Sequence, residues 1–200
     1  MKTLYLIRHG LTRGLQEHLY YGATDLPLLP EGEEELRRLS AAGGYPSPEY
    51  CRVVTTGMLR TEQSLRCLYG EVPHDTEPLL REINFGIFEM RSHEEIQDLP
   101  EYQAWMNAER FFSAAPPGGE SWDMMEQRLR EGLAHLCREE RDTILICHGG
   151  TIIILMSILF PGEKENPYTW QPPAGCGYSV DLEEKSYSYI PKPWITQKKV

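Results

Sequence analysis

Short apolar runs alternate with amphipathic stretches along the chain. Three apolar runs, each followed by glycine or a polar turn, predict buried strands at residues 3–7, 52–55 and 143–147. Helical spacing of apolar residues, with proline or serine at the start or glycine at the end, predicts helices at residues 31–42, 58–69 and 121–139. Strands alternating with helices predict an α/β fold, a three-layer αβα sandwich with a mainly parallel central sheet.

The remaining segments are less regular. Residues 78–119 contain two short helical patterns, at 93–98 and 101–108, and predict a small helical cap over the sheet edge. Residues 177–182 and 186–190 flank an acidic turn and predict a hairpin, and we expect the last residues of the chain to be frayed. We expect the whole chain, 1–200, to form a single domain with the cap as an insertion.

The composition indicates a globular domain and argues against several classes of partner. The chain is 40% hydrophobic and 25% charged, which is typical of a globular domain, and its net charge is −10. Because so acidic a chain lacks the basic field that polyanions require, we expect no nucleic-acid or membrane partner. The first residues predict a strand rather than a secretory signal. The five cysteines are odd in number and widely spaced, which argues against a disulfide framework or zinc cage, so we expect a cytoplasmic protein.

Two histidines occupy equivalent positions at strand ends. His9 follows the strand predicted at residues 3–7, His148 follows the strand predicted at residues 143–147, and glycine comes directly after each. Either one alone would be interpreted as a structural turn residue. If the two strands are parallel neighbours, however, both imidazoles lie at the same edge of the sheet, where sites form in such folds. The repetition predicts a site that uses both rings.

Three charged residues complete this candidate site. Arg8 precedes His9, and Arg60 lies near the start of a predicted helix, where a cation is electrostatically unfavourable unless it has another role. Two guanidinium groups are suited to bidentate contact with a phosphate. Glu82 is a candidate general acid, because displacing an alkoxide from a phosphate ester requires a proton donor. The set therefore favours phosphoryl chemistry on an ester.

The ordered set resembles the histidine phosphatase superfamily, also called phosphoglycerate mutase-like. The residues that carry the resemblance are Arg8-His9-Gly10, Arg60, Glu82 and His148-Gly149. Secondary matches are the run from Tyr21 to Leu28 with Glu31-Gly32, and Gly119-Glu120-Ser121. The resemblance spans residues 3–182 and implies the phosphoglycerate mutase-like version of the predicted fold. Motifs of thiolate phosphatases, aspartyl phosphatases, P-loops, zincins and serine hydrolases are lacking.

The resemblance also implies a mechanism. His9 would attack phosphorus and form a phosphohistidine that water hydrolyses, with Glu82 as acid and then base. Arg8, Arg60 and His148 would hold the phosphoryl oxygens, and no metal or other cofactor is implied. Thr12, Tyr21, Gly22 and Gly149 match positions expected to shape the phosphate site. The implied substrate is a small phosphorylated metabolite.

Several positions depart from the family pattern. Leu11 and Leu15 stand where many members have Glu or Gln and Asn, so one phosphate contact is missing or comes from a neighbour such as Arg13. Mutases of the family carry a basic clamp for a carboxylate, and here those positions hold His93 and Met106-Asn107. Hydrolysis is therefore favoured over a cofactor-dependent phosphoglycerate mutase. A catalytically silent sensor of a phosphorylated ligand is the remaining alternative.

A weaker resemblance, carried by three short runs of sequence, bears on the substrate specificity. Phe85-Gly86-Ile87-Phe88-Glu89, the run from Tyr102 to Trp105, and residues 116–121 look like the bacterial branch that includes α-ribazole phosphatases and broad-range phosphatases. Five side chains either line an aromatic leaving-group site or form the core of the cap: Tyr21, Phe85, Met90, Trp105 and Phe111. A monomer or a homodimer is expected.

Overall fold

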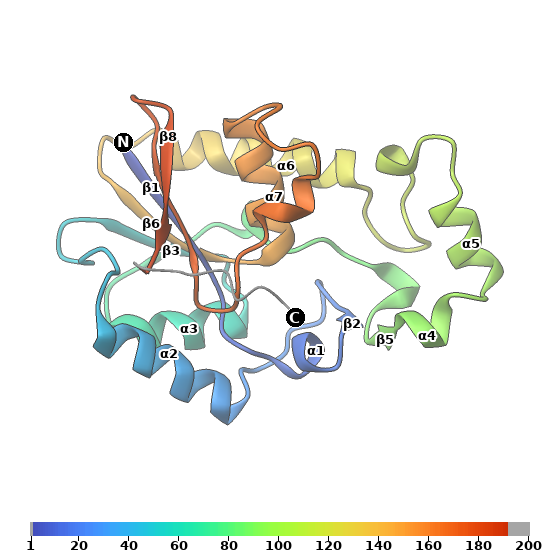
Figure 1. Ribbon diagram of the computed structural model, residues 1–200, viewed down its shortest axis with the longest axis horizontal. Helices are drawn as coiled ribbons and strands as arrows, with labels where there is room; N and C mark the ends of the chain where they lie inside the picture. The colour runs from blue at the N-terminus through green and yellow to red at the C-terminus, as the bar shows by residue number, and fades with distance from the viewer. Residues whose placement is uncertain (1, 192–200) are drawn as a thin grey trace.

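A six-stranded sheet forms the centre of the computed structural model, which describes residues 2–191. The strand order is β4-β3-β6-β1-β7-β8 (Figure 1). The first four strands of that order are parallel, β7 pairs antiparallel with β1, and β8 pairs antiparallel with β7. The bounds are β1 Thr3–Arg8, β3 Arg52–Thr55, β4 Asp75–Thr76, β6 Thr143–Cys147, β7 Gly177–Asp181 and β8 Ser186–Ile190. The predicted mainly parallel sheet and the C-terminal hairpin are confirmed.

Helices cover both faces of this sheet. Helices α2 (Pro30–Ala42) and α3 (Leu59–Tyr69) lie on one face, and α6 (Trp122–Cys137) and α7 (Gly149–Leu159) lie on the other (Figure 1). Successive side chains of a strand point to opposite faces, and those of β6 accordingly alternate between two apolar clusters. The three-layer αβα sandwich is thereby confirmed.

Helix α7 is absent from the sequence prediction. Its residues from Gly149 to Met156 are all buried, and its apolar side chains surround the whole helix. A helix that is buried on every side has no polar face and therefore shows no helical periodicity in the sequence. The predicted helices, in contrast, begin and end within two residues of their expected bounds. The Ser121 hydroxyl caps α6 by accepting from the Met124 amide.

The segment that the sequence predicts as a cap contains α4 (His93–Ile96) and α5 (Pro100–Met106), which extend away from the sheet (Figure 1). We call residues 85–114 the lobe. Its apolar cluster centres on Phe88 and Trp105 and is separate from the two clusters at the sheet. The lobe is tied to the segment after β1 by pairing of β2 (Leu19–Tyr20) with β5 (Arg91–Ser92).

Shorter elements complete the chain. They are α1 Arg13–Gln16 and the 3-10 helices η1 Pro78–Leu80, η2 Gly86–Phe88, η3 Phe111–Ser113 and η4 Pro167–Trp170. The expectation of a frayed C-terminus concerns residues that lie outside the described range.

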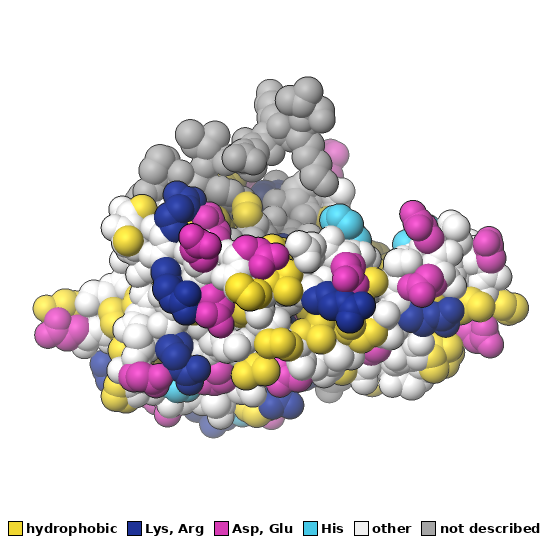
Figure 2. Space-filling model, turned by 90° about the horizontal axis from the view of Figure 1, so that it is seen from below, with side chains coloured by type: hydrophobic (Ala, Val, Ile, Leu, Met, Phe, Trp, Pro, Cys, Tyr) yellow, Lys and Arg dark blue, Asp and Glu magenta, His cyan; other side chains and the backbone are white. Residues whose placement is uncertain are grey.

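Two ion pairs lie on the exposed surface of α2. Arg37 bonds Glu33 and Arg38 bonds Glu35, each at 2.7 Å. On the face shown in Figure 2, basic side chains likewise lie beside acidic ones. Across residues 2–191, none of the helices combines the length and apolar character needed to cross a membrane.

Candidate active site

The two histidines predicted from strand ends do meet at one edge of the sheet. Strands β1 and β6 are parallel neighbours, with Arg8 in register with Cys147. The His9 amide donates to the Cys147 carbonyl at 2.9 Å, and the centroids of the His9 and His148 rings are 5.4 Å apart. A cavity of about 330 Å³ opens beside His9. The strand register therefore places the two rings side by side, with His9 lining a space that can hold a small ligand.

The ring of His9 is held in one tautomer. Its Nδ1 lies 2.7 Å from the Gly10 carbonyl oxygen, which can only accept, so Nδ1 carries the proton. The lone pair of the neutral ring is thereby placed on Nε2. Burial, and after it the positive charges of Arg60 and Arg8, hold the pKa of His9 well below its usual value. The ring consequently stays neutral, and Nε2 stays nucleophilic, at physiological pH.

His148 has both ring nitrogens engaged by protein groups. The Arg60 Nε donates to His148 Nδ1 at 3.1 Å, and His148 Nε2 lies 2.9 Å from the Thr56 hydroxyl oxygen. Since Nδ1 accepts, Nε2 carries the proton of the neutral ring. Burial, followed by the charge of Arg60, holds the pKa of His148 well below its usual value. In this arrangement His148 directly orients the guanidinium of Arg60.

Two buried guanidinium groups supply positive charge. The Arg60 side chain is fully buried and donates to the carbonyls of Thr24 (3.0 Å) and Gly22 (2.8 Å) as well as to His148. Hydrogen bonds thus use three of its five N–H groups, and Asp25 Oδ1 forms a longer ion pair with Nη1 at 3.8 Å, so two N–H groups have no hydrogen-bond partner within residues 2–191. Arg8 donates to the Pro172 carbonyl at 2.8 Å, and its buried Nε has no partner among the described residues. Such unsatisfied buried donors fit an anionic ligand.

The Glu82 carboxylate faces the same cavity. Its Oε2 accepts from the Gly150 amide in the first turn of α7 at 2.9 Å, and its Oε1 accepts from the Ile83 amide at 3.0 Å. A Cβ at position 150 would lie 2.3 Å from Glu82 Oε1, so only glycine permits this approach. The second glycine after His148 therefore positions the carboxylate, a signal that the sequence analysis did not use.

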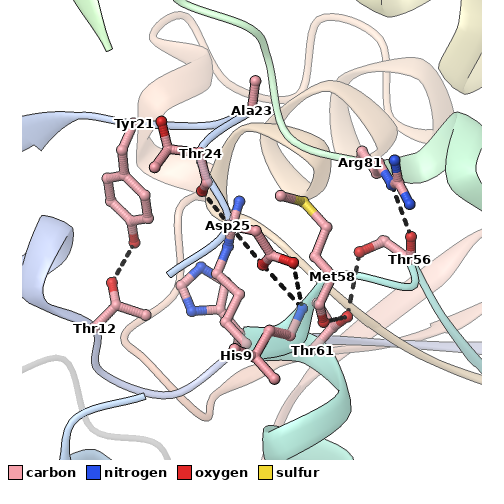
Figure 3. A network of polar contacts seen from close by, with 12 residues as sticks. His9, Thr12, Tyr21, Ala23, Thr24, Asp25, Thr56, Met58, Thr61 and Arg81 are labelled. Atoms are coloured by element: carbon pink, nitrogen blue, oxygen red, sulfur yellow. Dashed lines mark hydrogen bonds and ion pairs between the residues drawn. The ribbon is translucent and has the colours of Figure 1, made fainter. Parts of the chain in front are cut away.

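The other predicted residues support those that line the cavity. Tyr21 lines it, and its hydroxyl accepts from Thr12 at 2.8 Å (Figure 3). Burial raises the pKa of Tyr21, so its phenol remains protonated. Thr12, Gly22, His148 and Gly149 lie outside the lining and next to residues that form it. A Cβ at position 22 would lie 1.6 Å from the Ile83 carbonyl, which explains the glycine there.

The loop that contacts Arg60 is held by Glu89. The Glu89 carboxylate accepts from the amides of Gly22, Ala23 and Thr24, and from the Thr24 hydroxyl at 2.7 Å. It accepts as well from the Phe85 amide at 2.9 Å. The carbonyls of Gly22 and Thr24 accept hydrogen bonds from Arg60, and the Glu89 carboxylate of the lobe holds the same two residues by their amides. In the sequence, Glu89 stands out only as the last residue of the run from Phe85 that resembles the bacterial branch.

The structure locates Leu15 and four of the five candidates for an aromatic-lined site. Leu15 lines the cavity, whereas the Arg13 guanidinium is exposed and pairs with Glu17 at 2.9 Å, so Arg13 does not supply the missing contact. Of the five aromatic-site candidates, Tyr21 and Phe85 line the cavity. Trp105 and Phe111 pack in the lobe cluster instead. Nine lining residues were not predicted as site residues: Gly14, His18, Leu19, Ile83, Trp122, Gly150, Ile153, Tyr168 and Gln171.

Arg128 on α6 supports the backbone around Glu82. Its Nε and Nη2 donate to the Glu120 carboxylate at 2.7 and 2.8 Å, and Nη2 donates to the Glu82 carbonyl at 3.0 Å. Its Nη1 donates to the carbonyls of Leu79 and Arg81, both at 2.7 Å. All five N–H groups of the guanidinium are therefore used. Arg128 is a positioning residue for the segment that carries the carboxylate.

Replacing Arg128 by Met is expected to lower kcat/KM by about tenfold to a hundredfold, because small misplacement of a reacting group has effects of that order. If Arg128 acts through Glu82, hydrolysis of an alkyl phosphate falls more than that of p-nitrophenyl phosphate, whose leaving group needs no proton. The control is Arg130→Met, which changes an exposed ion pair with Glu126 on the same helix. Equal slowing of both esters by Arg128→Met would mean a purely structural role.

Comparison with known proteins assigns the chain to a family. The family model of the histidine phosphatase superfamily (branch 1) matches residues 4–190. Adenosylcobalamin/alpha-ribazole phosphatase of Escherichia coli K12 is 27% identical over 188 residues, covering 91% of each chain. A crystal structure of a candidate alpha-ribazole-5′-P phosphatase from E. coli aligns with TM-score 0.81 at 27% identity, covering 94% of each chain. A phosphoglycerate mutase structure from Thermus thermophilus aligns with TM-score 0.69 at 32% identity, covering 90% of this chain and 92% of that one.

Proposed function

Because the chain belongs to the histidine phosphatase superfamily, branch 1, and is a phosphatase, we propose that it hydrolyses phosphomonoesters through a phosphohistidine on His9, without a metal ion. The observation that carries the proposal is the hydrogen bond from His9 Nδ1 to the Gly10 carbonyl. It directs the lone pair of a neutral ring to Nε2, beside two buried guanidinium groups with unused donors.

In the first half-reaction, His9 Nε2 attacks phosphorus opposite the ester oxygen. The N–P bond forms as the P–O ester bond breaks, and Glu82 gives its proton to the departing oxygen. The free N–H groups of Arg8 and Arg60 bind the phosphoryl oxygens and offset their charge. His148 and Glu89 act indirectly, because they hold Arg60 and its loop.

In the second half-reaction, the Glu82 carboxylate removes a proton from water. The resulting hydroxide attacks phosphorus, the N–P bond breaks, and inorganic phosphate leaves. Neutral His9 and protonated Glu82 are regenerated, so the cycle closes without a further reagent. In other phosphoryl transfers a magnesium ion stabilises the negative charge. In this proposal Arg8 and Arg60 have that role.

The proposed substrate is a small phosphorylated metabolite, with α-ribazole phosphate as the first to assay because two of the similar proteins are named for it. Phosphoglycerate mutation is less well supported by the site. His93 bonds Tyr102 at 3.1 Å in the lobe, and the described residues that line the cavity include only two arginines and no lysine. Both arginines are assigned to the transferred phosphoryl group, which leaves neither for a substrate carboxylate.

The experiment that tests the proposal is rapid quenching of the enzyme during turnover of a 32P-labelled ester in EDTA. We expect label on His9 that survives alkali and is lost in warm acid, because protonation of the ring nitrogen breaks the N–P bond. An acid-stable phosphoprotein would contradict the proposal. Phosphate binding without any turnover would identify a sensor, and isomerisation of 3-phosphoglycerate would identify a mutase.

A further inference from the structure

A second cavity adjoins the one beside His9. Its volume is about 240 Å³, and three side chains line both cavities: Trp122, Ile153 and Tyr168. Trp122 lies at the start of α6, Ile153 on α7 and Tyr168 on η4. The Trp122 and Tyr168 rings meet edge to face, with centroids 5.7 Å apart. The two cavities are therefore neighbours along these shared residues, which we call the shared wall, and His9 lines only the first cavity.

The walls of the second cavity are mainly apolar. Besides the three shared side chains, Phe112, Ile154 and Pro167 line it. Phe112 is 58% exposed and Tyr168 is 50% exposed, so two large aromatic side chains of the lining present apolar surface to solvent beside the cavity, as in ligand-binding grooves. Ligand sites in proteins commonly occupy about 300–1,000 Å³, so the first cavity lies at the lower end of that range and the pair lies well within it.

The charges of the two cavities differ. The arginines, Arg8 and Arg60, line the first cavity, and within residues 2–191 neither cavity is lined by a further arginine or a lysine. The second cavity has two carboxylates in its lining, Asp123 and Glu126, one turn apart on α6; Glu126 forms an exposed ion pair with Arg130, and Asp123 accepts from the Ser113 hydroxyl. A phosphoryl group is thus directed to the first cavity, and a second negative charge on the substrate would meet carboxylates in the other.

We propose that the second cavity is a subsite for the distal part of the leaving group, and that it selects an apolar, ring-containing group without further negative charge. This inference rests on the proposed function, because the phosphoryl group must be bound next to His9. The ester oxygen then lies in the first cavity, and the organic group extends past Trp122 and Tyr168. The stated class excludes carboxylated and multiply phosphorylated esters.

The test compares three aryl phosphates: phenyl phosphate, 4-biphenylyl phosphate, and 4-biphenylyl phosphate with a carboxylate on its distal ring. The leaving groups of the first two are similarly acidic, so a difference in kcat/KM reports binding of the second ring. We expect kcat/KM to be at least tenfold higher for 4-biphenylyl phosphate than for phenyl phosphate. The carboxylated ester is expected to lose that advantage because of Asp123 and Glu126.

Two variants locate the effect. Ser157 lines only the second cavity, so Ser157→Trp is expected to abolish the tenfold advantage and leave phenyl phosphate within twofold of the wild type; Ser157→Ala is the matched control. Glu126→Lys, at a partly exposed position on α6, is expected to raise kcat/KM at least threefold for the carboxylated ester alone. This second variant keeps the test decisive if Ser157→Trp fails to fold.

Failure of the subsite and failure of the proposed function give different results. If the wild type hydrolyses phenyl phosphate and 4-biphenylyl phosphate with equal kcat/KM, the subsite is overturned and the proposed function stands. Equal loss for all three esters in folded Ser157→Trp would also overturn it. Absence of turnover with every ester overturns the proposed function and the subsite together.

Discussion

Replacing His9 with alanine is expected to lower kcat/KM for p-nitrophenyl phosphate by a factor of at least about 10⁴, because the variant has no atom to carry the phosphoryl group. His9 is 2% exposed, and among the described residues its ring bonds only the Gly10 carbonyl, so the substitution removes little else. Arg8 and Arg60 remain, and inorganic phosphate should still bind. Steady-state kinetics measure the first effect, and titration calorimetry measures the second.

The control for this prediction is His18→Asn. His18 lines the same cavity but is exposed and adopts a positive φ of 54°, a conformation that asparagine tolerates. We expect the control to stay within about threefold of the wild type. Activity of the His9→Ala variant above 1% of wild type would show that another group is the nucleophile.

Replacing Glu82 with glutamine is expected to slow hydrolysis of alkyl phosphates by roughly 10²- to 10⁴-fold, the usual contribution of a general acid. Glutamine keeps the volume of the side chain and one hydrogen bond to the amide of Ile83 or Gly150, but it cannot give a proton to the departing oxygen. Esters of acidic phenols need no such proton, so formation of the phosphoenzyme from them should slow by less than about tenfold.

The measurement is a series of esters that differ in leaving-group acidity, followed by the pre-steady-state burst as well as at steady state. A steeper dependence on leaving-group acidity in Glu82→Gln than in the wild type supports the role. Glu120→Gln is a useful comparison, because it changes a nearby carboxylate that contacts Arg128 instead of lining the cavity. Equal slowing of every ester by Glu82→Gln would remove Glu82 as the acid.

The fold and the meeting of the two histidines could be predicted from the sequence because both follow from the order of strands and helices. Parallel strands bring their carboxyl ends to one edge, so His9 and His148 could be paired without knowledge of any side-chain contact. Helix α7 was missed because its burial removes the polar face on which periodicity depends. Its second glycine nonetheless directly follows the motif that was recognised, and that glycine donates to Glu82.

Residues that hold or extend the site were harder to find. In the sequence, Arg128 and Glu89 look like ordinary charged residues of a helix and a loop. Their hydrogen bonds go to backbone groups far away in the chain, and such partners follow only from the packed structure. The wall formed by Trp122, Ile153 and Tyr168 comes from three separate elements, and no local pattern connects them.

The shared wall between the two cavities has a consequence for the divergence of such enzymes. His9, Arg8 and His148 sit at the ends of central strands, whereas the wall residues belong to helices on one face of the sheet. The Trp122 and Tyr168 rings contact each other, and the catalytic orientation of His9 depends on the Gly10 carbonyl instead. Descendants of this chain can therefore exchange wall side chains and acquire a new preference while inheriting the reaction unchanged.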